Sequence, residues 1–195
     1  MIPSAAARVV VLVGSVALLV IPHLQHRKGG RGGRGGAGGK KLLERLLLGL
    51  VSLGFLLPLI WVATPVLALA DYPLRPAPYI TGIILLAAGL WLLHRSHATL
   101  GENWSISLEL RERHELVTRG IYRRVRHPMY LALLVYSLGQ ALVLPNWIAG
   151  PSYGVAFSCL LVFRLGREER IMLERFGKDY EAYMERTRRL IPGVW

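Results

Sequence analysis

Five apolar segments alternate with polar connections along the chain. They cover residues 5–21, 46–69, 79–93, 130–144 and 147–163. Helices over these segments would have almost no polar face, which suits lipid and does not suit the surface of a soluble domain. Only the segment 46–69 exceeds the ~20 residues that cross a ~30 Å hydrocarbon layer, so we expect the others to recruit flanking residues or to stop short. The pattern predicts an all-α integral membrane protein with about five transmembrane helices.

The composition agrees with this pattern. Of 195 residues 53% are hydrophobic and only 18% are charged, which is too apolar for an ordinary soluble domain. The first apolar segment is followed by IPHLQHRKGG, where a signal peptide would have small residues at a cleavage site. We therefore expect the first segment to be a retained helix.

The basic residues predict the orientation in the membrane. All of the 24 lysine and arginine residues except Arg8 and Arg75 lie in segments 23–45, 94–127 and 164–195. Five crossings that begin outside place these three segments on one side, and the positive-inside rule makes that side cytoplasmic. The N-terminus is thus expected outside and the C-terminus inside. We attribute the net charge of +12 to membrane orientation and to attraction for anionic lipid, and we expect no nucleic acid as a partner.

The glycine-rich stretch within residues 27–41 has an alternative interpretation. GGRGGRGGAGGKK is similar to RGG-type RNA-binding sequences. It lacks interleaved aromatic residues, however, and it joins two predicted membrane helices. We expect a flexible basic linker.

The sequence gives little support for a metal site or for disulfide bonds. Cys159 is the only cysteine and lies in an apolar run, so we expect it to be a packing residue. His23/His26 and His94/His97 have one-turn spacing, but no nearby carboxylate or cysteine completes a ligand set. We expect interfacial histidines and no metal.

The polar chemistry is concentrated on the predicted inner side. The fourth and fifth segments are separated by little more than Pro145 and Asn146, which predicts a helical hairpin that brings RRVRHPMY (123–130) beside RLGREER (164–170). Pro128 suits the first turn of a helix, and we expect His127 before it to be in an extended conformation. Arg164 and Glu168 share a helical face, where a plain salt bridge is the simpler interpretation, while Glu169 points elsewhere.

Two further features complete the inner side. Residues 99–122 lack a helical period and are expected to form strands or loops on the membrane face. Gly177 is expected to end one helix, and KDYEAYMERT to begin another.

These motifs together resemble a known family. LVTRGIYRRVRHPMY, then LGQAL, PNW and FRLGREERIMLERFGKDYEAYMERTRRLIPGVW, is similar to the isoprenylcysteine carboxyl methyltransferase family over roughly residues 100–192. The family hallmark is Arg-His-Pro-x-Tyr, an apolar hairpin, a Glu-Glu pair and Phe-Gly-x-x-Tyr-x-x-Tyr. The wider superfamily includes phospholipid N-methyltransferases and sterol reductases.

The resemblance implies a cofactor, a substrate and a set of site residues. S-adenosylmethionine is expected to bind on the cytoplasmic side and to leave as S-adenosylhomocysteine, next to a lipid-modified acceptor. A matching position implies a substrate-side arginine at Arg164, and Arg126 matches the arginine of the central motif. Because an arginine fork can fix a carboxylate, both arginines are candidates for holding the acceptor. Matching positions imply cofactor contacts from His114, Glu115, Leu116, Val117, Tyr122, His127, Pro128, Met129, Tyr130 and Glu168.

We therefore expect a single membrane domain over residues 1–195. Residues 1–93 would carry three N-terminal helices and the linker 27–41, and residues 94–195 the catalytic methyltransferase core. The leading hypothesis is carboxyl O-methylation of a prenylated cysteine or a similar lipidic acid. The alternatives are a phospholipid or small-molecule N- or S-methyltransferase, an NADPH-dependent reductase of the sterol type, and a non-enzymatic scaffold. The oligomeric state stays open.

Overall fold

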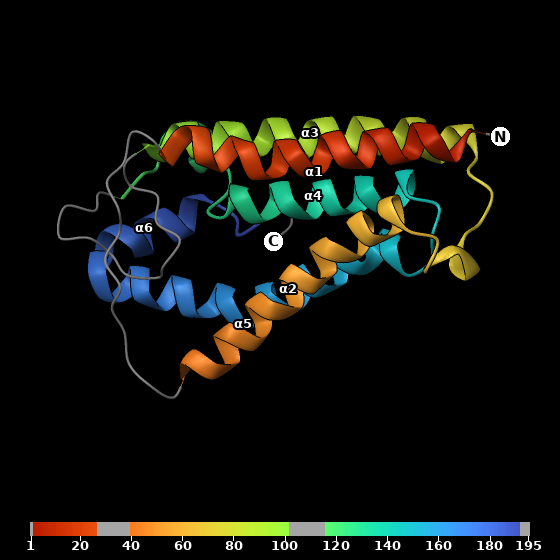
Figure 1. Ribbon diagram of the computed structural model, residues 1–195. Helices are drawn as coiled ribbons and strands as arrows, with labels where there is room; N and C mark the ends of the chain where they lie inside the picture. Colours follow the sequence, from red (N-terminus) through yellow and green to blue (C-terminus); the bar gives the residue numbers. More distant parts are fainter. Residues whose placement is uncertain (1, 27–39, 102–115, 192–195) are drawn as a thin grey trace.

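The chain forms a bundle of long helices. The computed structural model describes residues 2–26, 40–101 and 116–191 (Figure 1). Within them the helices are α1 (Ser4–His26), α2 (Lys40–Ala63), η1 (Ala68–Ala70), α3 (Pro76–Leu100), η3 (Gly120–Arg123), α4 (Pro128–Val143), α5 (Ala149–Phe176) and α6 (Lys178–Arg186). The described part of the chain is all-helical apart from two isolated β-bridges.

In the described part of the chain, three helices are long and apolar enough to cross a membrane. The candidate spans are Ser4–Leu24, Leu42–Ala63 and Pro76–Leu100, while α4 is a shorter apolar helix. Large hydrophobic side chains stand exposed along them, including Val13, Leu46 and Ile84. Such exposure is expected where the neighbour is lipid. The all-α membrane architecture is confirmed at this level.

Small residues let α3 and α4 approach closely. A Cβ atom added at Gly89 would lie 2.7 Å from the Tyr136 nitrogen, and one added at Gly139 would lie 2.6 Å from the Leu86 nitrogen. Gly82 meets the carbonyl of Gly139 in the same way, at 2.8 Å. Close backbone approach through glycine is a common way to pack helices in lipid.

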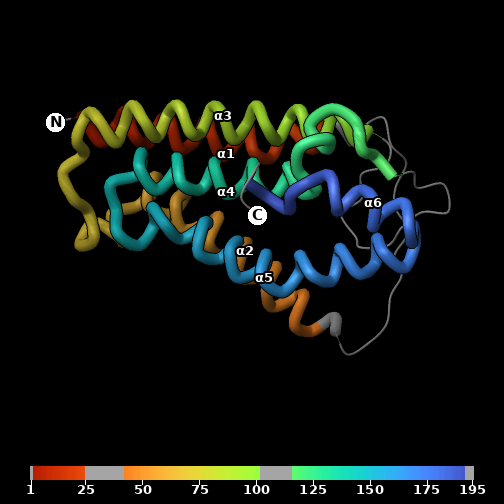
Figure 2. The backbone as a smooth tube through the Cα atoms, turned by 180° about the vertical axis from the view of Figure 1, so that it is seen from behind, coloured from red at the N-terminus to blue at the C-terminus, as the bar shows by residue number. Residues whose placement is uncertain are grey.

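The second pair of helices, α2 and α5, packs similarly. Gly54 faces the backbone of Ser152, whose hydroxyl donates a hydrogen bond to the Gly54 carbonyl at 2.8 Å. α4 and α5 are joined by residues 144–148 and run in opposite directions from that loop (Figure 2). Both views show the two helices close together at the loop and further apart at the other end.

Polar side chains tie the connections together at the loop end of the bundle. Asn146 donates to Asp71 Oδ1 at 2.6 Å and to the carbonyl of Leu67 at 2.7 Å. Its Oδ1 accepts the N–H of Ala149 at 2.8 Å and so caps the start of α5. The Trp61 indole donates to the same Asp71 oxygen at 2.6 Å. The α2–α3 connection and the α4–α5 loop therefore lie on the same side of the bundle.

Several sequence predictions are corrected. The segment 46–69 is not one helix: α2 ends at Ala63 because Pro65 follows, and a turn leads into η1. The third helix runs on through His94 to Leu100, so the inner connection begins later than expected.

One single residue is also corrected: Cys159 is exposed on α5 and is not a packing residue. His97 is buried within the protein, with Nδ1 3.0 Å from the Leu93 carbonyl oxygen, and its predicted place at the membrane interface stays a prediction. Most of the segment expected to form strands or loops, 102–115, lies outside the described residues.

Candidate active site

The Arg-His-Pro stretch lies where α4 begins. Pro128 occupies the first turn of α4, as predicted, and His127 is the N-cap residue. Its φ of −121° and ψ of 59° are non-helical but not extended, so the predicted extended conformation of His127 is wrong in ψ. The backbone N–H groups of Arg126 and His127 donate to the carbonyls of Arg188 at 2.8 Å and Arg189 at 3.0 Å. The segment after α6 thus pairs with the stretch that precedes α4 and fixes it from the side.

A first polar group forms around Glu168. Arg164 Nε donates to Glu168 Oε1 at 2.8 Å, which confirms the predicted shared face. The Tyr130 hydroxyl donates to the same oxygen, and the His127 ring stacks on the Tyr130 ring at 5.5 Å. His127 Nδ1 lies 3.7 Å from Glu168 Oε2. The predicted residues His127, Tyr130, Arg164 and Glu168 are therefore brought together from α4 and α5.

A second polar group surrounds Glu169, whose side chain is 6% exposed. Arg126 Nε donates to Glu169 Oε1 at 3.0 Å, Arg189 Nη2 lies 2.8 Å from Oε2, and His127 Nε2 lies 3.5 Å from Oε1. Burial alone would raise the pKa of Glu169, but the contacts from His127, Arg126 and Arg189 lower the pKa to about 2. The carboxylate is therefore ionised throughout the physiological range.

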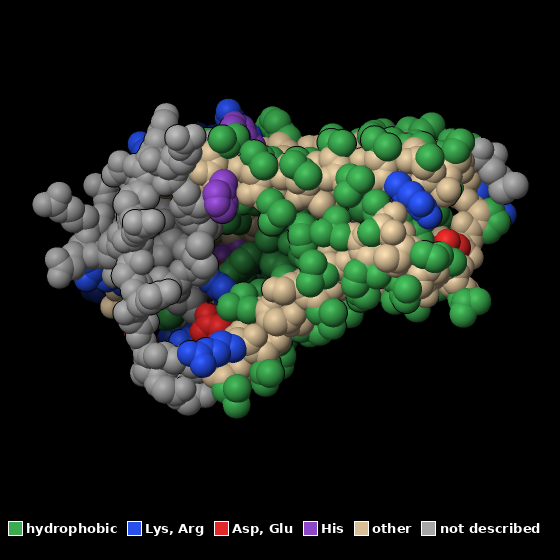
Figure 3. Space-filling view, viewed as in Figure 1, with side chains coloured by type: hydrophobic (Ala, Val, Ile, Leu, Met, Phe, Trp, Pro, Cys, Tyr) green, Lys and Arg blue, Asp and Glu red, His purple; other side chains and the backbone are tan. Residues whose placement is uncertain are grey.

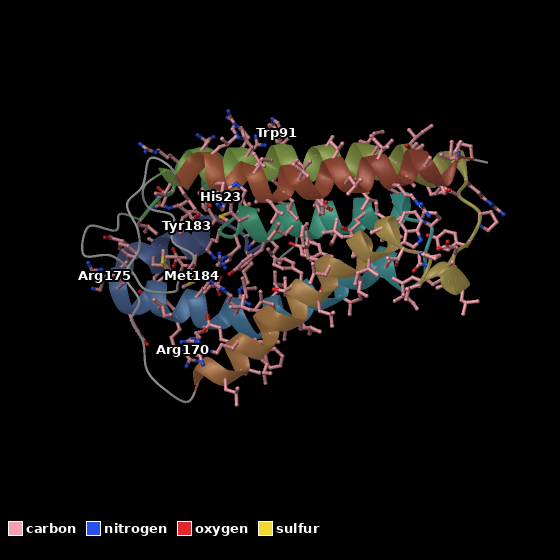
Figure 4. All side chains as sticks on the ribbon, viewed as in Figure 1. His23, Trp91, Arg170, Arg175, Tyr183 and Met184 are labelled. Carbon is pink, nitrogen blue, oxygen red and sulfur yellow. The ribbon has the colours of Figure 1, made fainter. Side chains whose placement is uncertain are left out.

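Arg126 faces Glu169 and α6. Its Nη1 donates to the carbonyls of Met184 at 3.1 Å and Thr187 at 2.6 Å. The Tyr183 hydroxyl donates to the Tyr122 carbonyl at 2.6 Å, so α6 is fastened to both ends of the stretch before α4. Tyr183 and Met184 are labelled on α6 in Figure 4, while Arg175 lies further out at the end of α5.

The remaining predicted residues lie around these two groups. Tyr122 is buried in η3, and its hydroxyl has no hydrogen-bond partner among the described residues. Burial, followed by Tyr183 and Glu168, raises its pKa. Leu116 and Val117 are half-buried, and Pro128 is buried. His114 and Glu115 lie outside the described residues.

Glu169 is the residue that sequence reasoning missed. It does diverge from Arg164, as predicted, but it diverges towards Arg126, which is 43 positions earlier in the chain. The signal available was the mismatch between two adjacent glutamates and a single arginine on the face of Arg164. A second cation was needed, and the RRVRH stretch just before the predicted helical hairpin could supply it.

An apolar cavity of about 470 Å³ adjoins the site. Its walls come from α1 to α5, and Met129, two positions after His127, is one of the lining residues. Figure 3 shows the surface hollowed between α1 and α2, with hydrophobic side chains along the hollow. The volume is typical of cavities that bind small ligands, roughly 300–1,000 Å³.

Comparison with known proteins places the chain in a family. The sequence profile of the phospholipid methyltransferase family matches residues 77–179, just over half of the chain. The chain belongs to this family of methyltransferases.

Several curated relatives of the chain are isoprenylcysteine O-methyltransferases. The chain is 30% identical over 115 residues to protein-S-isoprenylcysteine O-methyltransferase B of Arabidopsis thaliana, covering 58% of each chain. It is 35% identical over 98 residues to the Dictyostelium discoideum protein-S-isoprenylcysteine O-methyltransferase, covering 49% of this chain and 41% of that one. The human enzyme of that name is 30% identical over 117 residues, 59% of this chain and 41% of its own length.

A solved structure shares the fold. The eukaryotic intramembrane Ras methyltransferase ICMT matches with a TM-score of 0.55 and 22% identity, covering 81% of this chain and 55% of that chain. The resemblance found in the sequence is confirmed. The chain spans only about half the length of the relatives it matches.

Proposed function

We propose that the chain is an S-adenosylmethionine-dependent carboxyl O-methyltransferase. Its acceptor is a prenylated cysteine or a similar lipidic carboxylate at the cytoplasmic face of the membrane. The observation that carries the proposal is the assembly of Arg164, Glu168, Tyr130 and His127 directly beside an apolar cavity. One half of the site suits charged, water-soluble groups and the other half suits a lipid tail.

The residues present fit the methyl donor. The buried Tyr122 hydroxyl lacks a partner among the described residues, and the Glu168 carboxylate lies at the same site. The hydroxyl can donate a hydrogen bond and the carboxylate can accept one, which suits a methyl donor rich in hydroxyl and amine groups. Bound S-adenosylmethionine would supply a methyl group on a positively charged sulfur. Its contacts would come from His114, Glu115, Leu116, Val117, Tyr122, His127, Pro128, Met129, Tyr130 and Glu168.

The acceptor needs orientation more than it needs a base. A carboxylic acid with an ordinary pKa near ~4 is already ionised at neutral pH, so no proton has to be removed. Arginine binds a carboxylate through a planar fork, and we assign this role to Arg164, with Arg126 contributing its Nη2 group. Fixing the two reactants in line can lower the barrier by several kcal/mol, since effective molarities correspond to about 7–11 kcal/mol at best.

The cavity gives the acceptor tail a place beside the site. Its opening between α1 and α2 faces the lipid, so a tail can enter sideways without leaving the bilayer. Extracting the tail would cost about 0.8 kcal/mol per buried CH₂ group. The N-terminal helices then complete the catalytic core of residues 94–195, because their side chains line the cavity that holds the tail.

The membrane arrangement follows the same proposal. All five long helices cross the bilayer, α4 and α5 as a hairpin, with the N-terminus outside and the C-terminus and site inside. The hydrogen bonds from Asn146 to Asp71 and Leu67 support this arrangement, because they bring the α4–α5 loop to the side of the α2–α3 connection.

The family description favours a second candidate, methylation of a phospholipid amine. An ammonium acceptor must first lose a proton, and His127, Tyr130 or Glu168 would have to accept it. The two candidates differ in the product, because only a carboxylate acceptor gives a methyl ester.

Two measurements test the proposal. Calorimetric titration of the purified chain with S-adenosylhomocysteine and with NADPH should show binding of the former alone; binding of NADPH alone would identify a reductase. Radiolabelled methyl from S-adenosylmethionine should then appear in a base-labile ester of a prenylcysteine acceptor, whereas a base-stable label in phospholipid would favour the second candidate. His127→Ala and Glu168→Ala should each weaken cofactor binding, and unchanged affinity in both would refute the assigned site.

A further inference from the structure

A run of aromatic rings in stacked and edge contacts links the candidate site to the interior of the cavity. The His127 ring stacks on Tyr130, Tyr130 meets Phe157 at 5.9 Å, and Phe157 stacks on Tyr153 at 6.1 Å. Tyr153 then meets Phe55 of α2 edge-on at 6.0 Å. Tyr153 and Phe55 both line the cavity, whereas Phe157 is buried behind it.

The helix directions give the depth of each lining residue. α4 starts at the site, so Met129 lies at the site end of the cavity and Leu133 one turn further in. α5 runs the opposite way, and Tyr153 lies near its first turn, close to the 144–148 loop and far from Glu168. Phe55 lies 15 positions along α2 from Lys40, deeper than Val51 and Ser52. Tyr153 and Phe55 therefore form the end of the cavity that is most remote from the site.

The Tyr153 ring is held from several sides. Phe157 covers one face, and both Phe55 and Tyr136 meet the ring edge-on, with Tyr136 at 6.1 Å. The residue is 5% exposed and Tyr136 behind it 1%. Aromatic pairs in these geometries attract beyond their burial, so displacing the ring would break several contacts at once. Contacts with three other rings therefore hold Tyr153 in place at the floor of the cavity.

We infer that Tyr153, backed by Phe55, sets the longest tail that the acceptor can carry. The inference rests on the proposed function, because it treats the cavity as the site of the acceptor tail. A tail that fits has its carboxylate at Arg164 when its end reaches Tyr153. A longer tail meets the ring before the carboxylate reaches the arginine, so turnover falls although the tail still binds.

The inference predicts that Tyr153 affects the permitted length of the tail and not the affinity for tails of every length. Removing a side wall would change binding of all tails alike, because every tail passes the wall. Removing the floor affects only tails long enough to reach it. Pocket shape of this kind typically discriminates about 10–200-fold between neighbouring apolar groups.

The test compares kcat/KM for methylation of geranyl-, farnesyl- and geranylgeranyl-cysteine. Tyr153→Ala should raise the preference for the longest acceptor over the next shorter one by at least about tenfold relative to the unmodified chain. Tyr153→Phe keeps the ring and should keep the original preference. Leu19→Ala is the matched control, since Leu19 lines the lipid-facing side of the cavity and not its floor; all three rates should change by a similar factor.

Equal loss of all three rates in Tyr153→Ala, with affinity for S-adenosylhomocysteine retained, would overturn the inference. If Tyr153→Ala does not fold, Tyr153→Leu provides a smaller deepening, checked first by its thermal transition. If the unmodified chain methylates none of the acceptors, the proposed function has failed. The length limit is then read from thermal stabilisation of the chain by the same three ligands, where the shift for the longest ligand should increase in Tyr153→Ala; no increase would refute it.

Discussion

At the scale of single residues, Glu169 predicts how stability depends on pH. Its pKa in the folded chain, about 2, lies below the ordinary 4.5 because His127, Arg126 and Arg189 outweigh the effect of burial. A depressed pKa contributes stability that is complete above about pH 4.5 and is lost as the pH falls through about 2. The contribution is at most about 3 kcal/mol.

Melting temperatures of the detergent-solubilised chain measured from about pH 6 downward check this prediction. The unmodified chain should lose stability between about pH 4.5 and 2, and Glu169→Gln should lack that part of the loss because an amide does not titrate. Glu174→Gln, at an exposed position of α5, should keep it. Identical acid profiles for all three chains would contradict the role of Glu169.

The two arginines should separate stability from catalysis. Arg126 serves Glu169 and two α6 carbonyls, so Arg126→Gln should destabilise the fold by about 3–5 kcal/mol, the cost of breaking a buried ion pair. Arg164→Lys keeps the charge and loses the planar fork, so kcat/KM should fall about 10–100-fold with a smaller change in melting temperature. A stable but inactive Arg126→Gln, together with an active Arg164→Lys, would reverse the assignment.

At the scale of helices, the contact between α3 and α4 predicts an asymmetry between glycines. Gly89→Leu places side-chain atoms against the Tyr136 and Ala132 backbone, so it should destabilise the chain by at least about 1–3 kcal/mol, the usual cost of overpacking. Gly49→Ala on α2 meets open space and should be neutral or stabilise by about 0.4–1 kcal/mol. Thermal unfolding in detergent measures both. Equal tolerance would show that the two helices do not depend on this close approach.

The helices also show what could be predicted from the sequence. The order of apolar segments, the start of α4 at Pro128 and the break at Gly177, where φ is +50°, depend on local chemistry and were predicted. The ion pair of Arg164 and Glu168 was predictable because four positions span one helical turn. These features need only neighbours in the chain.

Features made by distant segments were not predictable in the same way. The pairing of Val125 with Arg188 joins segments 63 positions apart with no alternating pattern in either. The sequence offers a second cation in RRVRH, but without that pairing it does not single out Arg126 as the partner of Glu169. The cavity that begins at Met129 could not be predicted from the sequence either, because several of its lining residues lie on α1 and α2 and the family motifs do not include these helices.

At the scale of the whole molecule, the bundle has two unlike ends. The end near the 144–148 loop is closed by hydrogen bonds among Asp71, Asn146 and Trp61. The opposite end carries the two glutamates and their arginines, with the cavity reaching inward from it. The closed end keeps the helices together and leaves the other end free to hold the two substrates of the proposed reaction.

The last prediction concerns which side of the membrane each end occupies. In a Cys159→Ser background without other cysteines, single cysteines replace Leu69, Trp147 and Lys178, all of which are exposed. A membrane-impermeant maleimide should label Leu69→Cys and Trp147→Cys from the outside of intact cells, because Asn146 holds their two connections together. Lys178→Cys, at the start of α6, should react only after the membrane is opened or inverted. Labelling of Trp147→Cys together with Lys178→Cys would mean that α4 and α5 enter and leave on one side. Five crossings would then be wrong.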